Sequence, residues 1–122
     1  MDEIIRLTRL CKEDKNSLPQ LARAYADFGL MREAGRIWLE YAEFCWKKKD
    51  EDGFLSSLGE FLKLGIESLD LRLYFAKILL MKNKRDKAKE EFRYLASEFS
   101  KRGDEKRVKE IEGYLKSLER GL

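Results

Sequence analysis

The sequence predicts an all-α protein, and three observations lead to this fold class. Residues that favour helices, chiefly Leu, Ala, Glu, Lys and Arg, dominate the composition. Eight glycines and one proline are too few for the closely spaced turns of an all-β protein. Apolar residues also recur at the spacing of one helix face, as in Leu18, Leu21, Ala22 and Tyr25.

The periodic segments and the breaks between them predict seven helices. Their expected ranges are 2–13, 18–28, 31–48, 53–64, 69–82, 86–101 and 104–119. We expect the glycines at three breaks, Gly29, Gly65 and Gly103, to end helices in the left-handed conformation. A tight turn then reverses the chain, so that neighbouring helices run antiparallel.

Polar residues at the predicted helix starts suggest how these helices are capped. The run Ser17-Leu18-Pro19-Gln20 resembles a capping box, with an N-cap serine, a proline in the first turn and a glutamine at the third position. Ser68, Asp86 and Asp104 are the N-caps expected for three later helices.

The length of 122 residues predicts one domain, 1–122, with a modest core. The net charge of +3 is small beside 26 basic and 23 acidic side chains. The two signs are interleaved even in the last third, where the basic surplus lies. This pattern is typical of a solvated, ion-paired surface and disfavours a nucleic-acid footprint.

Several features bear on location. The first thirty residues lack the pattern of a signal peptide, and no window is apolar enough to span a membrane, so we expect a cytoplasmic protein without a membrane partner. Cys11 and Cys45 form no CxxC pair and are expected to be free thiols. Asn and Gln occur only three times, which suits a protein from a hot environment.

The residue types needed for catalysis are scarce, and we expect neither an enzyme nor a cofactor. The chain has no histidine, which removes the commonest general base and the usual zinc ligand sets. No glycine forms a phosphate-binding motif, and the carboxylates are scattered at helix-surface spacing. Cys45 is expected to be a buried, inert thiol and Trp38 a core residue, whereas the exposure of Trp46 stays open.

An internal repeat emerges when the chain is offset against itself by about 37 positions. The blocks are 12–48, 49–85 and 86–122, and their apolar residues fall into common columns. The first four columns are Leu18, Leu55 and Phe92; Leu21, Leu58 and Leu95; the small residues Ala22, Gly59 and Ala96; and Tyr25, Leu62 and Phe99. We expect the small residues to mark close helix crossings and the large ones to be buried.

These columns resemble the tetratricopeptide repeat, in which a large residue precedes a large–small pair, an aromatic residue and a later Ala–aromatic pair. The first block shows the resemblance best, with Leu18, Leu21-Ala22, Tyr25, Gly29, Ala34 and Trp38. The resemblance implies a short right-handed α-solenoid of antiparallel helix pairs, in which residues 1–13 form a capping helix or half-repeat. A second frame, with Phe75-Ala76, Leu79, Ala88 and Phe92, also fits part of the signature.

The resemblance further implies a non-catalytic scaffold or adaptor that binds a charged peptide or a helical segment of another protein. Ligands of this family lie in the concave groove, whose positions in this chain are Asn16, Arg23, Asp27, Glu60, Lys63, Glu90, Arg93 and Lys101. An RNA-binding helical-repeat protein is the alternative, as is an interaction module of a larger regulator or assembly. Self-association through the end helices also stays open.

Overall fold

The computed structural model describes residues 2–120, and every regular element in that range is helical. The elements are α1 (Asp2–Glu13), the short 3₁₀ helix η1 (Lys15–Ser17), α2 (Leu18–Asp27), α3 (Met31–Lys47), α4 (Glu51–Lys63), α5 (Leu69–Met81), α6 (Arg85–Lys101) and α7 (Glu105–Glu119). The all-α prediction is therefore confirmed, and each α-helix begins and ends within two residues of its predicted range.

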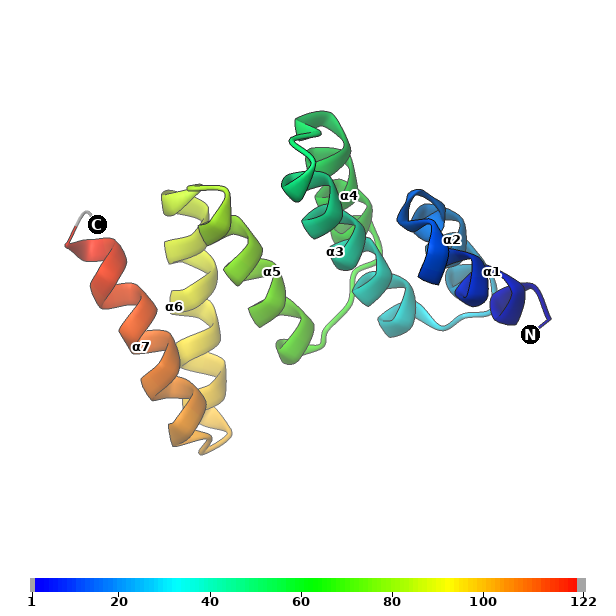
Figure 1. Cartoon of the computed structure of the whole chain (residues 1–122). Coiled ribbons are helices and arrows are strands. Elements are labelled where there is room, and N and C mark those ends of the chain that lie inside the picture. The colour runs from blue at the N-terminus through cyan, green and yellow to red at the C-terminus, as the bar shows by residue number, and fades with distance from the viewer. Residues whose placement is uncertain (1, 121–122) are drawn as a thin grey trace. The chain divides into compact units, whose positions relative to one another are not determined.

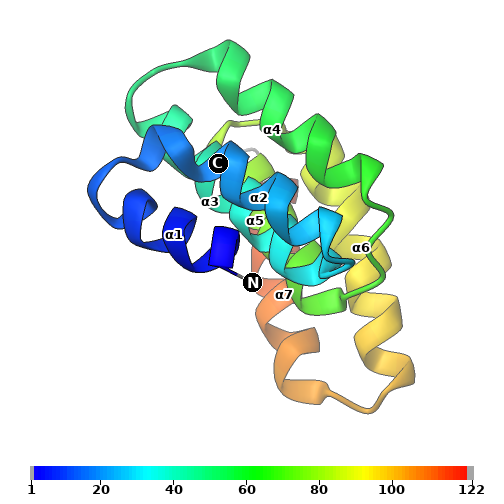
Figure 2. The same ribbon diagram turned by 90° about the vertical axis from the view of Figure 1, so that its right-hand side faces the viewer.

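The chain divides into two compact units, Met1–Leu71 and Arg72–Leu122, which we call unit 1 and unit 2. In unit 1, α3 packs along both α2 and α4, and α1 packs on α2 (Figures 1 and 2). The fully buried side chains Leu7, Leu39, Cys45 and Phe54 come from α1, α3 and α4. Each of these helices therefore contributes to the core.

Unit 2 contains α5 from Arg72 onward, together with α6 and α7, and α6 lies along α7 (Figure 1). Its most deeply buried large side chains are Ile78, Phe92, Leu95 and Ile111. The Phe92 ring stacks on Tyr114 of α7 with a centroid distance of 5.0 Å. Lys77 of α5 pairs with Glu110 of α7 at 2.9 Å, so α5 is tied to α7 as well.

Four helices end in the same hydrogen-bonded turn. At the end of α2, the Leu30 N–H donates to the Tyr25 carbonyl (2.9 Å) across Gly29, whose φ is +79°. This is the Schellman arrangement, and it recurs at the ends of α3, α5 and α6. Left-handed Gly29 and Gly103 were expected there, but Lys49 and Asn83 hold the same conformation without being glycine.

The predicted caps are confirmed only in part. Asp104 accepts the Arg107 N–H at 3.2 Å, and Ser68 accepts the Leu71 N–H at 3.4 Å. The expected Ser17 capping box is wrong, because the chain enters α2 already wound in η1 and the Ser17 side chain makes no cap hydrogen bond. The Asp86 cap is also wrong, since α6 begins one residue earlier, at Arg85.

Unit 2 repeats the helices of unit 1 at a distance of 54 residues. α3 (Met31–Lys47) and α6 (Arg85–Lys101) have the same length, and both ends are shifted by that distance. The left-handed residues Lys49 and Gly103 follow the same spacing. So do the caps of α4 and α7, because Asp50 accepts the Gly53 N–H at 3.0 Å as Asp104 accepts that of Arg107. The three helices α2–α4 therefore have a counterpart in α5–α7.

The large residues of the predicted core columns are buried in α6 of unit 2 but are only partly buried in α4. Leu58 is buried with Leu21 and Leu95, as expected. Leu55 and Leu62, however, are 43% and 58% exposed, so their assignment to the core is wrong. The buried stripe of α4 lies one residue earlier, at Phe54, Ser57, Leu58 and Phe61. One residue turns a helix face by about 100°, and the division into three 37-residue repeats stays a prediction.

The predicted close crossing at Gly59 is also wrong. A Cβ added to Gly59 would have no atom within 4 Å. The close approaches lie instead at two glycines outside that column. A Cβ on Gly35 would strike Ile66, and one on Gly53 would strike the Asp50 carboxylate and approach the Cys45 sulfur to 2.8 Å. Ala22, by contrast, is fully buried, as expected of a crossing position.

Candidate functional site

Unit 1 contains a hollow of about 290 Å³ between α1, η1, α2 and α3. Ten residues line it, and they divide into an apolar floor, a charged rim and two neutral polar side chains. They are Thr8, Cys11, Lys12, Lys15, Leu18, Leu21, Tyr25, Arg36, Ile37 and Glu40. We call this cavity the α1–α3 hollow.

The floor of the hollow consists of buried apolar side chains from three helices. Cys11 lies on the inner side of α1, Leu18 and Leu21 on the buried stripe of α2, and Ile37 on that of α3. Each is less than a tenth exposed. The floor therefore offers a place where apolar groups of a ligand can leave water.

The rim carries Lys12, Lys15, Arg36 and Glu40, all of which are exposed. In the part of the chain that the structure describes, none of these four side chains forms an ion pair within 4.0 Å. Three cations thus face one carboxylate around the same opening. An anionic group placed there would gain charge-assisted hydrogen bonds without breaking an existing salt bridge.

The Cys11 thiol belongs to the floor rather than to any reactive centre. Burial raises the pKa of Cys11 above its ordinary value, and the charges of Asp14 and Glu40 raise it further. A raised pKa keeps the thiol protonated at neutral pH, and a protonated thiol is a weak nucleophile. Cys45 is also free and buried, so both cysteines match the prediction of unpaired thiols.

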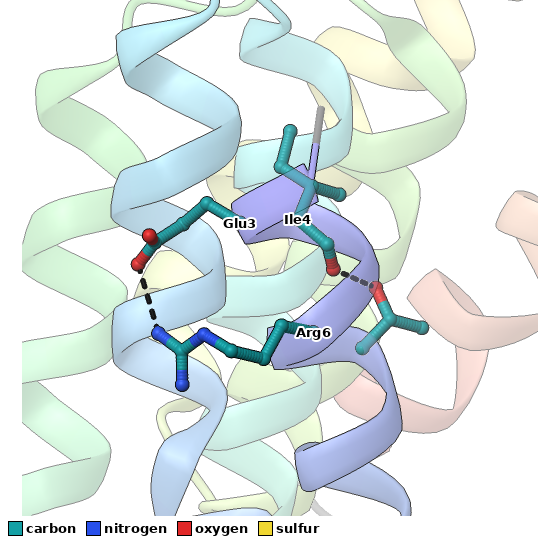
Figure 3. Close-up of polar contacts among 4 residues, drawn as sticks. Glu3, Ile4 and Arg6 are labelled. Atoms are coloured by element: carbon teal, nitrogen blue, oxygen red, sulfur yellow. Dashed lines mark hydrogen bonds and ion pairs between the residues drawn. The ribbon is translucent and has the colours of Figure 1, made fainter.

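Two neutral polar side chains, Thr8 and Tyr25, complete the lining. The Thr8 hydroxyl donates to the Ile4 carbonyl at 2.7 Å, within α1 (Figure 3). The same figure shows Arg6 paired with Glu3 at 3.1 Å, a contact between two exposed side chains of the same helix. Because the Thr8 proton is already used, its oxygen can only accept a further hydrogen bond.

The predicted groove residues of unit 1 lie outside the hollow. Arg23 stands over the Trp38 ring at 5.5 Å, and Asn16 accepts a hydrogen bond from Lys48 at 3.0 Å. Glu60 pairs with Lys63 of the same helix at 3.5 Å, and Asp27 is an exposed residue at the end of α2. These predicted groove residues therefore lie on three different elements, η1, α2 and α4.

The predicted groove residues of unit 2 are Glu90, Arg93 and Lys101, all exposed on α6. Arg93 pairs with Glu119 of α7 at 3.8 Å, and Lys101 with Glu98 at 3.6 Å. Exposed pairs of this kind add little to stability and leave the side chains available to a ligand.

The sequence analysis did not predict the α1–α3 hollow, although the positions of its cationic residues are visible in the sequence. Lys12 and Lys15 flank the turn from α1 into η1, and Arg36 directly precedes the buried Ile37. Cations beside buried positions on consecutive helices can be noticed in a sequence. That they meet around one opening depends on how α1 packs on α2, which the sequence pattern does not specify.

Within residues 2–120, no three His, Cys, Asp or Glu side chains gather closely enough to hold a metal ion. None of the described helices combines the length and apolar character needed to cross a bilayer. Comparison of the chain with protein-family models, with curated proteins and with solved structures gave no match.

Proposed function

We propose that this chain is a non-catalytic protein-interaction module that binds an acidic segment of another protein in the α1–α3 hollow. The proposal keeps the predicted class of function, a cytoplasmic scaffold or adaptor with tetratricopeptide-like helix pairs in a short solenoid. It moves the binding site from the predicted groove to the hollow of unit 1.

One observation carries the proposal: an apolar floor and three cations without ion-pair partners share one opening. A segment that carries both an acidic and an apolar side chain matches this arrangement. Its carboxylate would contact Lys12, Lys15 or Arg36 at the rim, while its apolar side chain would cover the floor. Hydrophobic contact would supply affinity, and the charges would supply preference for acidic over basic ligands.

The size of the hollow sets the expected strength of binding. About 290 Å³ accommodates one or two side chains, at the lower end of the range for small-ligand sites. We therefore expect weak binding by a single short segment, and stronger binding only where a partner adds contacts elsewhere. Exposed cations on the rim also imply that affinity falls as salt screens them.

The test uses two defined peptides, one that alternates Glu with Leu and one that alternates Lys with Leu. Calorimetric titration should show binding of the acidic peptide and none of the basic one. The triple variant Lys12→Ala, Lys15→Ala, Arg36→Ala should weaken binding of the acidic peptide at least tenfold, a loss of about 1.4 kcal/mol.

A matched control removes three exposed cations of unit 2, Lys87, Lys106 and Lys109, and so changes the net charge equally. Equal weakening by the control would mean that only net charge matters, and the proposed site would be wrong. A second variant, Arg23→Ala, Glu60→Ala, Arg93→Ala, tests the groove. Loss of binding in this variant alone would return the site to the groove.

The same variants distinguish the RNA-binding alternative from the proposed binding of an acidic peptide. A single-stranded RNA oligonucleotide that binds more tightly than the acidic peptide, with affinity falling steeply as salt rises, would contradict the proposed ligand class. Binding of the acidic peptide by the wild type and by the unit 2 control, together with its loss in the hollow variant, would support it.

A further inference from the structure

α4 carries an exposed apolar face that the packing of unit 1 does not use. Leu55 and Leu62 lie seven residues apart, which is close to two helical turns, and are 43% and 58% exposed. Gly59 lies between them on the same side, with no atom within 4 Å of an added Cβ. The three residues form one stripe, which we call the α4 outer face.

The counterpart helix in unit 2 shows that this position does not require leucine. At the 54-residue spacing, Leu55, Gly59 and Leu62 correspond to Lys109, Gly113 and Lys116 of α7, all of which are exposed. Lysine is the ordinary choice for a solvated helix face. Leucine at both places in α4, with glycine kept between them, therefore points to a contact that α7 does not make.

The charges at the two ends of the α4 outer face are opposite. Asp52 lies three residues before Leu55 and is exposed, and Lys63 follows Leu62 and is also exposed. Within α4, Lys63 reaches only Glu60, at 3.5 Å and with three quarters of its side chain in solvent. A helix that is acidic at its start and basic at its end is complementary to a second copy of itself laid antiparallel.

From this pattern we infer that two copies of the chain associate through the α4 outer face in antiparallel orientation. A two-fold axis passes near Gly59, so that Leu55 of each copy packs against Leu62 of the other. The glycines at the axis carry no side chain, which allows the two helices to approach closely. Asp52 of each copy then lies toward Lys63 of the other, as an isologous contact requires.

This contact is small. One helix face with two leucines per copy falls well short of the roughly 1,600 Å² typical of stable complexes. It therefore predicts a reversible dimer whose population depends on protein concentration. The contact also differs from self-association through the end helices, which the sequence leaves open, because α4 lies in the interior of the helix order.

Sedimentation equilibrium of the full chain over a wide concentration range tests the inference. We expect a monomer–dimer equilibrium for the wild type. The variant Leu55→Lys, Leu62→Lys copies the residues of α7 and should remain monomeric at every concentration, with an unchanged circular dichroism spectrum because neither position is buried.

A matched control replaces two equally exposed apolar residues elsewhere in unit 1, Ile5→Lys and Phe28→Lys, which are 49% and 53% exposed. It should dimerise like the wild type. If the wild type stays monomeric up to about millimolar concentration, the inference is overturned, because association weaker than that is negligible. A dimer that survives the two leucine substitutions would overturn it too.

Charge exchange tests the antiparallel orientation. Asp52→Lys alone and Lys63→Asp alone should each raise the dimer dissociation constant several-fold, because each places like charges together. The double variant should bring the constant back toward that of the wild type. Failure of the double variant to recover dimerisation would rule out the proposed orientation.

Discussion

The two units share a backbone plan but fill one part of it differently. In unit 2, Arg72 of α5 donates two hydrogen bonds to Glu91 of α6, at 2.7 and 3.2 Å. Its guanidinium also lies 4.2 Å from the centroid of the Tyr94 ring. The hydrogen bonds that Arg72 donates to the Glu91 carboxylate raise the pKa of Arg72, so the arginine stays charged.

The corresponding positions in unit 1, 54 residues earlier, are Leu18, Ile37 and Glu40, and all three line the α1–α3 hollow. Two shorter apolar side chains replace a bidentate ion pair, and an acidic residue replaces the aromatic ring. α1 packs over this side of unit 1, with Cys11 on the floor of the hollow. The cavity therefore results both from side-chain choice on the shared helices and from the placement of α1.

A second pair of corresponding positions also carries different side chains in the two units. In unit 1, a Cβ added to Gly53 would lie 2.8 Å from the Cys45 sulfur, closer than side chains normally approach. In unit 2 the corresponding residues are Phe99 and Arg107, and the Arg107 guanidinium lies 5.3 Å from the Phe99 ring centroid. In unit 1 a side chain of α3 lies against the backbone of α4 at a glycine, whereas in unit 2 two long side chains stack between the helices.

The largest expected effect comes from breaking the close approach in unit 1. Gly53→Ala should destabilise the chain by about 2–3 kcal/mol, because the new methyl displaces the Asp50 cap and crowds Cys45. Chemical denaturation followed by circular dichroism measures this. The control is Gly113→Ala on α7, where nothing lies within 4 Å. Equal midpoints for the two variants would contradict the comparison.

The Arg72–Glu91 ion pair of unit 2 should tolerate replacement by the apolar residues of unit 1 only when both partners are replaced together. Arg72→Leu alone should cost about 1–2 kcal/mol, because it leaves the largely buried Glu91 carboxylate without its donor. Adding Glu91→Ile, which copies Ile37, should recover most of that loss. A double-mutant cycle in denaturant gives the coupling energy, and additive losses would show that the two positions are not equivalent to Leu18 and Ile37.

Alkaline pH should reveal the two buried thiols of unit 1, Cys11 and Cys45, since unit 2 contains no cysteine. The prediction concerns Cys45. Burial raises the pKa of Cys45 above its ordinary value of 9.0, so the unfolded chain loses this proton at a lower pH than the folded chain does. The stability from the neutral thiol is therefore fully present below about pH 9 and is lost as pH rises through the folded pKa.

The slope of stability against pH tests this point. One such group contributes at most about 1.4 kcal/mol per pH unit. Cys45→Ala should flatten the decline above pH 9, whatever it does to stability at neutral pH. An unchanged slope would mean that the folded and unfolded thiols titrate alike.

The smallest effect concerns the open glycine of the α4 outer face. Gly59→Ala should stabilise the chain by about 0.5–1 kcal/mol through helix propensity, because no atom obstructs the new methyl. Thermal unfolding of dilute protein measures this without interference from association. A loss of stability would show that α4 packs more tightly at Gly59 than the structure indicates.

The sequence by itself determined the parts of this protein that depend on neighbouring residues. Helix periodicity predicted all seven α-helices, and glycine predicted the left-handed turns at Gly29 and Gly103. Asp104 was identified as a cap because a carboxylate before a helix accepts the free N–H groups of its first turn. These features need only a few consecutive residues, so local sequence is sufficient.

Only the tertiary structure decided which side of each helix is buried and what lies between helices. α4 has two apolar stripes one residue apart, and the packing of α3 against α4 buries Phe54 and Phe61 rather than Leu55 and Leu62. The α1–α3 hollow likewise depends on the placement of α1. Burial is a property of the space between helices, and residues distant in the sequence jointly determine that space.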